Sequence, residues 1–164
     1  MAPALRVFVL CLASGLMILA NGKRQDKEGD CDGSCPSGWT KFDTRCFLFQ
    51  LDEKEWSDAE RHCTLIDGNL ASVQTSGEYT FLRDLIHKAT HTHKEVWLGG
   101  YDSPKNNVWL WSDGSQFEFN GWGKGEPNNY GGGEGCMEMN LRGRDYVNDS
   151  KCNKKKSFVC AMTP

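Results

Sequence analysis

Cysteine content is the feature that most constrains how this chain can fold: there are eight cysteines in 164 residues. In so small a chain, this density indicates either a disulfide framework formed in an oxidising compartment or metal binding by thiolates. The N-terminus decides between the two, because residues 1–22 have the pattern of a secretory signal peptide. Arg6 precedes an apolar run over residues 7–20, and residues 20–22 form a small-x-small cleavage site. We therefore expect a secreted, extracellular protein held together by disulfides.

The apolar run has a competing interpretation, a signal anchor that would hold a type II membrane receptor. Its 14 residues are fewer than the roughly 18 to 20 that span a bilayer, and no second apolar run follows, so we expect no membrane insertion. Removal of residues 1–22 would also remove Cys11 and leave seven of the eight cysteines. Because seven is odd, one thiol must stay free, be capped by a small thiol or bridge to another chain.

Charge and composition narrow the classes of function. The 19 basic and 22 acidic residues give a formal net charge of −3, so there is no electrostatic reason to expect nucleic-acid binding. The sequence is 38% hydrophobic and 11% aromatic, which is enough to form a buried core. No internal repeat or interdomain linker is found. We expect a short polar tail over residues 23–34 and one domain over residues 35–164.

The order of periodic segments predicts an α+β domain. Aromatic and β-branched residues over 40–50 indicate a hairpin, and capping boxes at 57–60 and 75–78 each precede an amphipathic helix. Short strands separated by Gly, Asn and Pro then follow. The strand candidates are residues 96–98, 108–111, 136–140 and 157–162. Residues 119–135 hold seven Gly and one Pro in seventeen positions, and so long an irregular stretch in a small domain is usually functional or held by a disulfide or metal.

No catalytic arrangement can be named in this sequence. There is no nucleophile–base pair, no His-Glu-x-x-His and no phosphate-binding glycine loop followed by Lys. His87, His91 and His93 come nearest to a metal or base cluster, but they follow the second helix in a polar segment and are interpreted as solvated surface. Cys31 and Cys35 lack the two-residue spacing of a redox motif. We therefore expect that the protein is not an enzyme.

Oxygen-bearing side chains in and after the long loop are more informative. Glu126, Asn128 and Glu134 lie within nine residues, and Asn148 with Asp149 forms a second cluster. Ca²⁺ takes six to eight oxygen ligands, so three carboxylates and two amides leave positions for the hydroxyls of a ligand. A Glu/Asn pair also places a carboxylate acceptor beside an amide donor, which suits a sugar hydroxyl that donates to one and accepts from the other.

Several motifs, in this order and spacing, resemble those of the C-type lectin family. They are Trp39 with Cys35 and Cys46, Val96-Trp97-Leu98-Gly99-Gly100, Glu126-Pro127-Asn128 and Val147-Asn148-Asp149. The resemblance covers residues 35–162 and implies the C-type lectin-like fold, with two helices, short antiparallel sheets and a long Ca²⁺-binding loop. It implies three internal disulfides: Cys35–Cys46, Cys63–Cys160 and Cys136–Cys152. It also implies that the peptide bond before Pro127 is cis.

The resemblance assigns a Ca²⁺ cofactor at one site and glycans on microbial or cell surfaces as partners. The implied metal ligands are Glu126, Asn128, Glu134, Asn148 and Asp149. The implied carbohydrate-binding residues are Glu126, Asn128, Glu134, Asn148 and Tyr130. The short secreted form resembles small fish lectins and their type II antifreeze relatives. We therefore expect a lectin that agglutinates microbes in innate host defence, and we keep an ice-binding antifreeze protein as an alternative.

The preferred sugar stays open at this point. In the family, Glu-Pro-Asn goes with mannose-type sugars, which favours mannose, whereas galactose binders usually carry Gln-Pro-Asp. Tyr130 followed by Gly131-Gly132-Gly133 resembles the aromatic, glycine-rich loop of galactose-binding members, so a galactose- or lactose-binding lectin, with or without Ca²⁺, is the alternative.

The sequence departs from the family pattern at a few positions. Val147 replaces the usual Trp, and Asn106 and Asn129 replace acidic ligands of auxiliary Ca²⁺ sites, so at most one well-formed site is expected. Asn148 also lies in an N-glycosylation sequon, and a glycan there would abolish the proposed ligand; we favour the ligand. The family disulfides leave Cys31 over, which predicts a homodimer linked by Cys31–Cys31.

Overall fold

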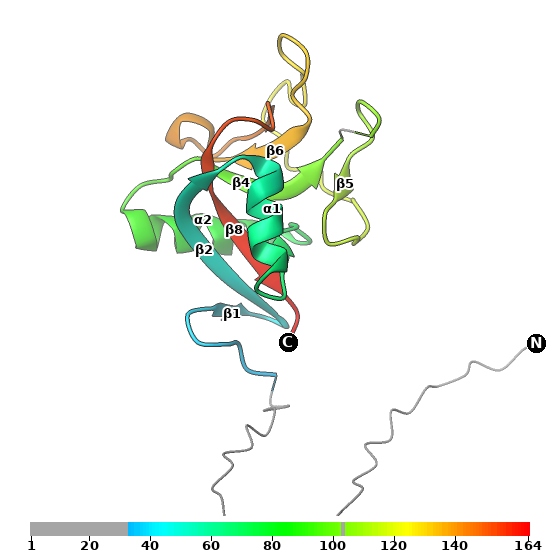
Figure 1. Cartoon of the computed structure of the whole chain (residues 1–164). Helices are drawn as coiled ribbons and strands as arrows, with labels where there is room; N and C mark the ends of the chain where they lie inside the picture. Colours follow the sequence, from blue (N-terminus) through cyan, green and yellow to red (C-terminus); the bar gives the residue numbers. More distant parts are fainter. Residues whose placement is uncertain (1–32, 103) are drawn as a thin grey trace, which may run out of the picture.

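Eight strands form one mixed sheet with two helices in the computed structural model, which describes residues 33–102 and 104–164 (Figure 1). The strands are β1 (Thr40–Phe42), β2 (Arg45–Lys54), β3 (Asn69–Leu70), β4 (Val96–Tyr101), β5 (Leu110–Trp111), β6 (Cys136–Met139), β7 (Val147–Ser150) and β8 (Lys156–Met162). The helices are α1 (Trp56–Thr64) and α2 (Ser76–Thr90), with a 3-10 turn at Leu141–Gly143. The expected α+β class with two helices is confirmed.

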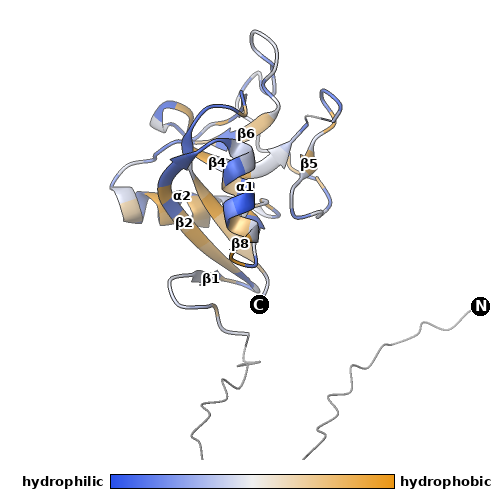
Figure 2. Ribbon diagram, in the orientation of Figure 1, coloured by the Kyte–Doolittle hydropathy of each residue, from blue (hydrophilic) through white to orange (hydrophobic). Residues whose placement is uncertain are grey.

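The last strand lies in the middle of the sheet. The main strand order is β1-β2-β8-β4-β6-β7, with β3 paired to β8 and β5 paired to β4. β8 runs antiparallel to β2 and parallel to β4, where Val96 lies opposite Ser157. Figure 2 shows hydrophobic residues along β8 and the adjoining part of β2, whereas the last residues of β2 are hydrophilic and mostly exposed.

Each helix covers the sheet through a few buried side chains. Leu82 and Ile86 of α2 belong to the larger core cluster, together with Phe47 of β2 and Val159 of β8. A smaller cluster packs α1 through Ala59 against further residues of β3, β4 and β8. All of these side chains are at most slightly exposed, so apolar burial provides the main stabilisation of the fold.

The Val-Trp-Leu-Gly-Gly motif forms β4 and has a packing role. Gly99 donates its backbone N–H to Ala71 O at 2.9 Å. A Cβ at Gly99 would lie 2.5 Å from Leu70 O and 2.8 Å from Ser112 Oγ. Only glycine therefore lets β3 and the turn after β5 approach β4 this closely.

The three implied disulfides are confirmed. Cys35–Cys46 joins the start of the domain to β2, Cys63–Cys160 joins α1 to β8 across 97 residues of sequence, and Cys136–Cys152 joins β6 to the segment after β7. The predicted signal peptide over 1–22, most of the 23–34 tail and the predicted interchain Cys31 lie outside the described residues.

The predicted cap at 57–60 is wrong, whereas the one at 75–78 is confirmed. α1 begins at Trp56, the extended residue before it is Glu55, and no side chain caps this end. The Glu60 carboxylate is instead used by β3, because it accepts the backbone N–H of Leu70 at 2.7 Å. At α2, Thr75 Oγ1 accepts the backbone N–H of Glu78 at 3.0 Å, as expected of a helix N-cap.

The long loop and the C-terminus lie at opposite ends of the domain. Figure 1 shows the gold loop at about residues 126–134 at the top of the molecule, whereas β1 and the C-terminus lie at the bottom.

No helix among the described residues is both long and apolar enough to cross a membrane.

Candidate functional site

The long loop lies between β5 and β6 and, as predicted, contains no helix or strand. Its Glu126–Pro127 peptide bond is cis, which confirms the expectation. Two backbone hydrogen bonds hold the first half of the loop: Gly123 N donates to Val147 O at 2.8 Å, and Glu126 N donates to Gly123 O at 3.0 Å. The loop is therefore anchored on β7, which carries the second cluster of predicted ligands.

Asp149 brings the two clusters together. Its carboxylate is almost fully buried and accepts the backbone N–H of Asn128 on Oδ1 at 3.1 Å and of Asn129 on Oδ2 at 2.6 Å. Bonds from two backbone donors to an ionised carboxylate are strong and directional. Asp149 thus fixes the segment that follows Pro127.

Glu134 closes the glycine-rich half of the loop. Its Oε2 accepts the backbone N–H of Tyr130 at 2.8 Å, and its own N–H donates to Asn129 Oδ1 at 3.0 Å. Residues 131–133 between them all have positive φ, which is favourable only for glycine. The run of glycines therefore allows a tight turn that brings Glu134 back beside Asn129.

Glu126 lies against the same carboxylates. One oxygen, Oε1, accepts the Tyr146 hydroxyl at 3.2 Å, and the other, Oε2, is buried with no hydrogen-bond partner. Burial raises the pKa of Glu126, and the nearby Asp149 and Glu134 carboxylates raise it further, against the opposing Tyr146 hydrogen bond. Among the described residues, none of these three carboxylates forms an ion pair with Lys, Arg or His.

Asn148 lies next to this group, with its amide nitrogen turned inward. Nδ2 donates to Glu138 Oε1 at 2.8 Å and also to the backbone oxygen of Asp149. The side chain is buried, so a glycan on Nδ2 would break both contacts. The structure thus argues against use of the Asn148 sequon, and the role of Asn148 as a ligand stays a prediction.

The donor set fits a hard divalent cation. Three carboxylates lie close together without a cationic partner, and one of their oxygens is buried and unpaired, which costs free energy unless a positive group is supplied. In the described part of the chain, no three His, Cys, Asp or Glu side chains are already arranged as a metal site. With the amide oxygens of Asn128 and Asn148, the carboxylates of Glu126, Glu134 and Asp149 would offer the number and kind of oxygen ligands that suit Ca²⁺.

Tyr130 lies beside these predicted ligands, as do Asn106 and Asn129, the two asparagines at the positions of auxiliary Ca²⁺ ligands. The Tyr130 side chain is 80% exposed, so its ring is free to contact a ligand. Asn129 Nδ2 donates to Asn106 Oδ1 at 3.0 Å beside a cavity of about 340 Å³ that Asp102 and Glu134 also line. Because Asn106 and Asn129 carry amides in place of carboxylates, fewer carboxylates are left to bind an auxiliary cation.

Sequence reasoning missed two residues that support the site. The Tyr146 hydroxyl donates to Lys124 O at 2.6 Å, and its ring packs so closely on Gly123 that a Cβ there would lie 2.4 Å away. Tyr146 immediately precedes Val147, so an aromatic residue next to the position of the missing Trp was the available signal. Glu138, which accepts from Asn148, gave no such signal because only the pairing of β6 with β7 brings the two together.

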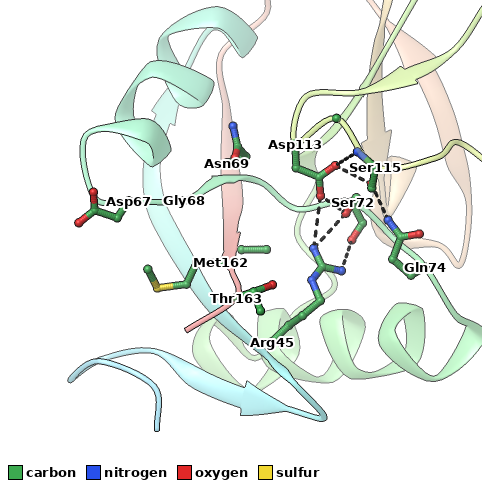
Figure 3. A pocket seen from close by; sticks show the side chains of 12 residues that line it. Arg45, Asp67, Gly68, Asn69, Ser72, Gln74, Asp113, Ser115, Met162 and Thr163 are labelled. Atoms are coloured by element: carbon green, nitrogen blue, oxygen red, sulfur yellow. Dashed lines mark hydrogen bonds and ion pairs between the residues drawn. The ribbon is translucent and has the colours of Figure 1, made fainter. Parts of the chain in front are cut away.

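A larger hollow, of about 530 Å³, lies near the C-terminus and away from this loop (Figure 3). Figure 3 shows Arg45, Ser72 and Asp113 pointing toward one another, and their polar groups pair among themselves. Arg45 also forms an ion pair with Glu78 at 2.9 Å. This cluster therefore ties β2 to the start of α2 and to the turn after β5, which is a structural role.

Comparisons with known proteins agree with this geometry. Residues 52–162 match the family model described as "Lectin C-type domain". The chain is 41% identical to "Galactose-specific lectin nattectin" of Thalassophryne nattereri, over 97% of this chain and 96% of that protein. It is 36% identical to "Lactose-binding lectin l-2" of Anguilla japonica, over 93% and 92% of the two chains. The herring type II antifreeze protein structure is similar with a TM-score of 0.73 and 31% identity, over 79% of this chain and 99% of that one.

Proposed function

The chain belongs to the C-type lectin family, and from this premise we propose that it binds sugars in a Ca²⁺-dependent way at the 119–135 loop and β7. The observation that carries the proposal is the buried, unpaired Glu126 Oε2 beside the carboxylates of Asp149 and Glu134. A buried carboxylate oxygen without a partner costs free energy, and a bound cation would compensate for this cost.

Each residue has a defined part in this proposal. Glu126, Asn128, Glu134, Asn148 and Asp149 hold the cation. The chemistry that a bound Ca²⁺ supplies is coordination of sugar hydroxyls at its open positions. The protein's own part is directional: the Glu126 carboxylate accepts a hydrogen bond from a hydroxyl, and the Asn128 amide donates one. The Asp149 bonds to Asn128 N and Asn129 N hold the backbone at the Asn128 end of this pair in place.

The first candidate ligand is a mannose-type sugar. In the C-type lectin family, the Glu-Pro-Asn motif goes with mannose-type sugars, which offer two vicinal equatorial hydroxyls. Exchange of the two groups in a Glu126→Gln/Asn128→Asp variant should weaken mannose-type binding and shift preference toward galactose. Binding of the wild type and of this double variant to immobilised mannose and galactose, with elution by each free sugar, measures the change. An unchanged preference would show that the pair does not determine specificity.

The second candidate is a galactose- or lactose-binding lectin. Two observations favour it: the names of the two similar relatives, and the 80% exposed Tyr130 ring, which can stack on the apolar face of a sugar. A Tyr130→Ala variant separates the candidates, because only a stacking mode should lose most of its affinity. The same column assay reports the result. Leu65→Ala, which truncates a similarly exposed apolar side chain just after α1, is the control.

Removal of the metal tests the Ca²⁺ requirement. EDTA should abolish retention on a sugar column and lower the melting temperature, because a cation bound only to the native state stabilises it, by about 2.7 kcal/mol at a hundredfold excess over Kd. Retention that survives EDTA would contradict the Ca²⁺ mechanism and leave sugar binding intact. Thermal hysteresis in a protein that binds no glycan would favour the ice-binding alternative instead.

The biological setting is part of the same proposal. We infer secretion from the predicted signal peptide over residues 1–22, and agglutination of microbes in host defence from sugar binding by a linked pair of domains. Agglutination of bacteria or yeast by the purified protein, inhibited by the free sugar that elutes it from the column, tests this role.

A further inference from the structure

A buried carboxylate, that of Glu138, lies beside Asn148 on the neighbouring strand. Glu138 of β6 is opposite Asn148 of β7 in the antiparallel register, and its Oε1 accepts the Asn148 amide N–H at 2.8 Å. Glu138 is fully buried. Because β7 also carries Asp149, any change in how Asn148 is held acts next to the proposed cation site.

A second contact engages the other oxygen of the Glu138 carboxylate. Lys156 Nζ forms an ion pair with Glu138 Oε2 at 2.6 Å and donates to Glu95 Oε2 at 2.8 Å. The same ammonium lies 5.3 Å from the centre of the Trp97 ring. Replacing a buried ion pair of this kind with apolar residues is often neutral for stability, so stability alone does not account for it.

The chemistry of the pair determines the orientation of the amide. An ionised carboxylate only accepts hydrogen bonds, so Asn148 has to present its NH₂ group to Glu138. Its carbonyl oxygen Oδ1 then points away from Glu138. We propose that Glu138, held by Lys156, is a positioning residue that orients the Asn148 amide so that Oδ1 is available to the cation. The expected effect on Ca²⁺ affinity rests on the proposed function, whereas the orientation of the Asn148 amide does not.

The single variant Glu138→Gln should reverse the amide. The Lys156 ammonium will attract the new carbonyl oxygen, so the glutamine NH₂ group faces Asn148. Two NH₂ groups repel each other, and Asn148 has to turn its oxygen inward and its nitrogen toward the loop. Loss of such an outer contact typically weakens metal binding about 10- to 100-fold, and we expect a decrease of this size in Ca²⁺ affinity.

A double variant separates positioning from a merely structural role. In Glu138→Gln/Lys156→Met no ammonium competes for the glutamine oxygen, which can accept from Asn148 again. Ca²⁺ affinity should recover most of the loss, even though the double variant retains fewer ion pairs than the single one. A purely structural role predicts the opposite order. Glu95→Gln is the matched control, because it removes the other carboxylate of Lys156 without touching Asn148 and should leave Ca²⁺ affinity unchanged.

Two measurements decide the outcome. Calorimetric titration with CaCl₂ gives the affinities, and NMR of the ¹⁵N-labelled, Ca²⁺-free full chain reports whether the Asn148 side-chain NH₂ is protected from solvent exchange. Protection in the wild type, its loss in Glu138→Gln and its return in the double variant support the proposal. An unprotected wild-type amide, or a double variant weaker than the single one, overturns it. A wild type that binds no Ca²⁺ but shows the protection pattern refutes the proposed function and leaves the orientation established.

Discussion

At the scale of single residues, the proposed ligands also hold the loop in shape. Asp149 accepts the N–H groups of Asn128 and Asn129, and Glu134 accepts that of Tyr130. Substitution of either carboxylate therefore changes both the charge of the site and the order of the loop. A variant such as Asn148→Ala, which removes no bond to the loop backbone, is a cleaner probe of the ligand set.

Gly99 provides a prediction at this scale. In Gly99→Ala the new Cβ would lie 2.5 Å from Leu70 O, so β3 and β4 have to separate. We expect a loss of about 1–3 kcal/mol in the free energy of unfolding, as for overpacked cores. Urea unfolding followed by tryptophan fluorescence measures it.

Gly77 is the matched control for this substitution. It lies in the first turn of α2, and a Cβ there would meet Phe42 at an ordinary 3.4 Å. Gly77→Ala should be neutral or stabilising by up to about 1 kcal/mol, because alanine favours the helix. Equal destabilisation by the two substitutions would show that the close approach at Gly99 is not the cause.

At the scale of elements, the helices and strands that could be predicted were those marked by a pattern in their own residues. Periodicity and turn residues placed both helices and the hairpin, and β4 and β8 contain the predicted apolar runs. β7 was missed because Val147–Ser150 holds Asn, Asp and Ser, which have low strand propensity; pairing with β6 imposes the strand. The proposed cation site shows the same division. Most of its candidate ligands belong to sequence motifs, whereas Glu138 reaches Asn148 only through the pairing of β6 with β7.

The corrected start of α1 leads to a prediction about helix caps. Thr75→Ala should lower the free energy of unfolding by about 1 kcal/mol, because it removes the bond to Glu78 N at the start of α2. Ser57→Ala should change it by less than about 0.5 kcal/mol, since Ser57 lies inside α1 and caps nothing. Chemical unfolding of both variants compares the two directly. A larger loss for Ser57→Ala would restore the capping box.

The junction between β4 and β8 predicts a pH dependence. Although burial opposes it, the hydrogen bonds from Lys156 and from the Arg142 N–H lower the pKa of Glu95 below 4.5. A lowered folded-state pKa adds stability that is present above the unfolded pKa and is lost as pH falls through the folded one. Glu95→Gln should therefore be less stable than wild type at pH 7, and the difference should disappear in acid.

Urea unfolding in Ca²⁺-free buffer at several pH values measures this difference. Glu53→Gln is the control, because its ion pair with Lys94 is at the surface and should contribute little at any pH. A Glu95→Gln deficit that stays constant from pH 7 into acid would contradict the assignment.

At the scale of the whole molecule, the cysteines predict how chains are joined. The six cysteines at positions 35–160 are all used in the three disulfides, and Cys31 lies outside the described residues. We propose that Cys31 links two chains, which would raise avidity for a multivalent surface. Non-reducing gels should show a dimer for wild type and a monomer for Cys31→Ser. A wild type of monomer mass without reductant would refute the covalent dimer.

The placement of the loop opposite β1 sets the geometry of such a pair (Figure 1). The described chain begins at the end of the domain that carries β1, opposite the proposed sugar-binding loop. If Cys31 joins two chains, as proposed, their two proposed sugar-binding loops would point away from each other. This arrangement suits a bridge between separate particles better than a pincer on one glycan chain, and larger, widely spaced targets should be clumped more readily than small oligosaccharides are chelated.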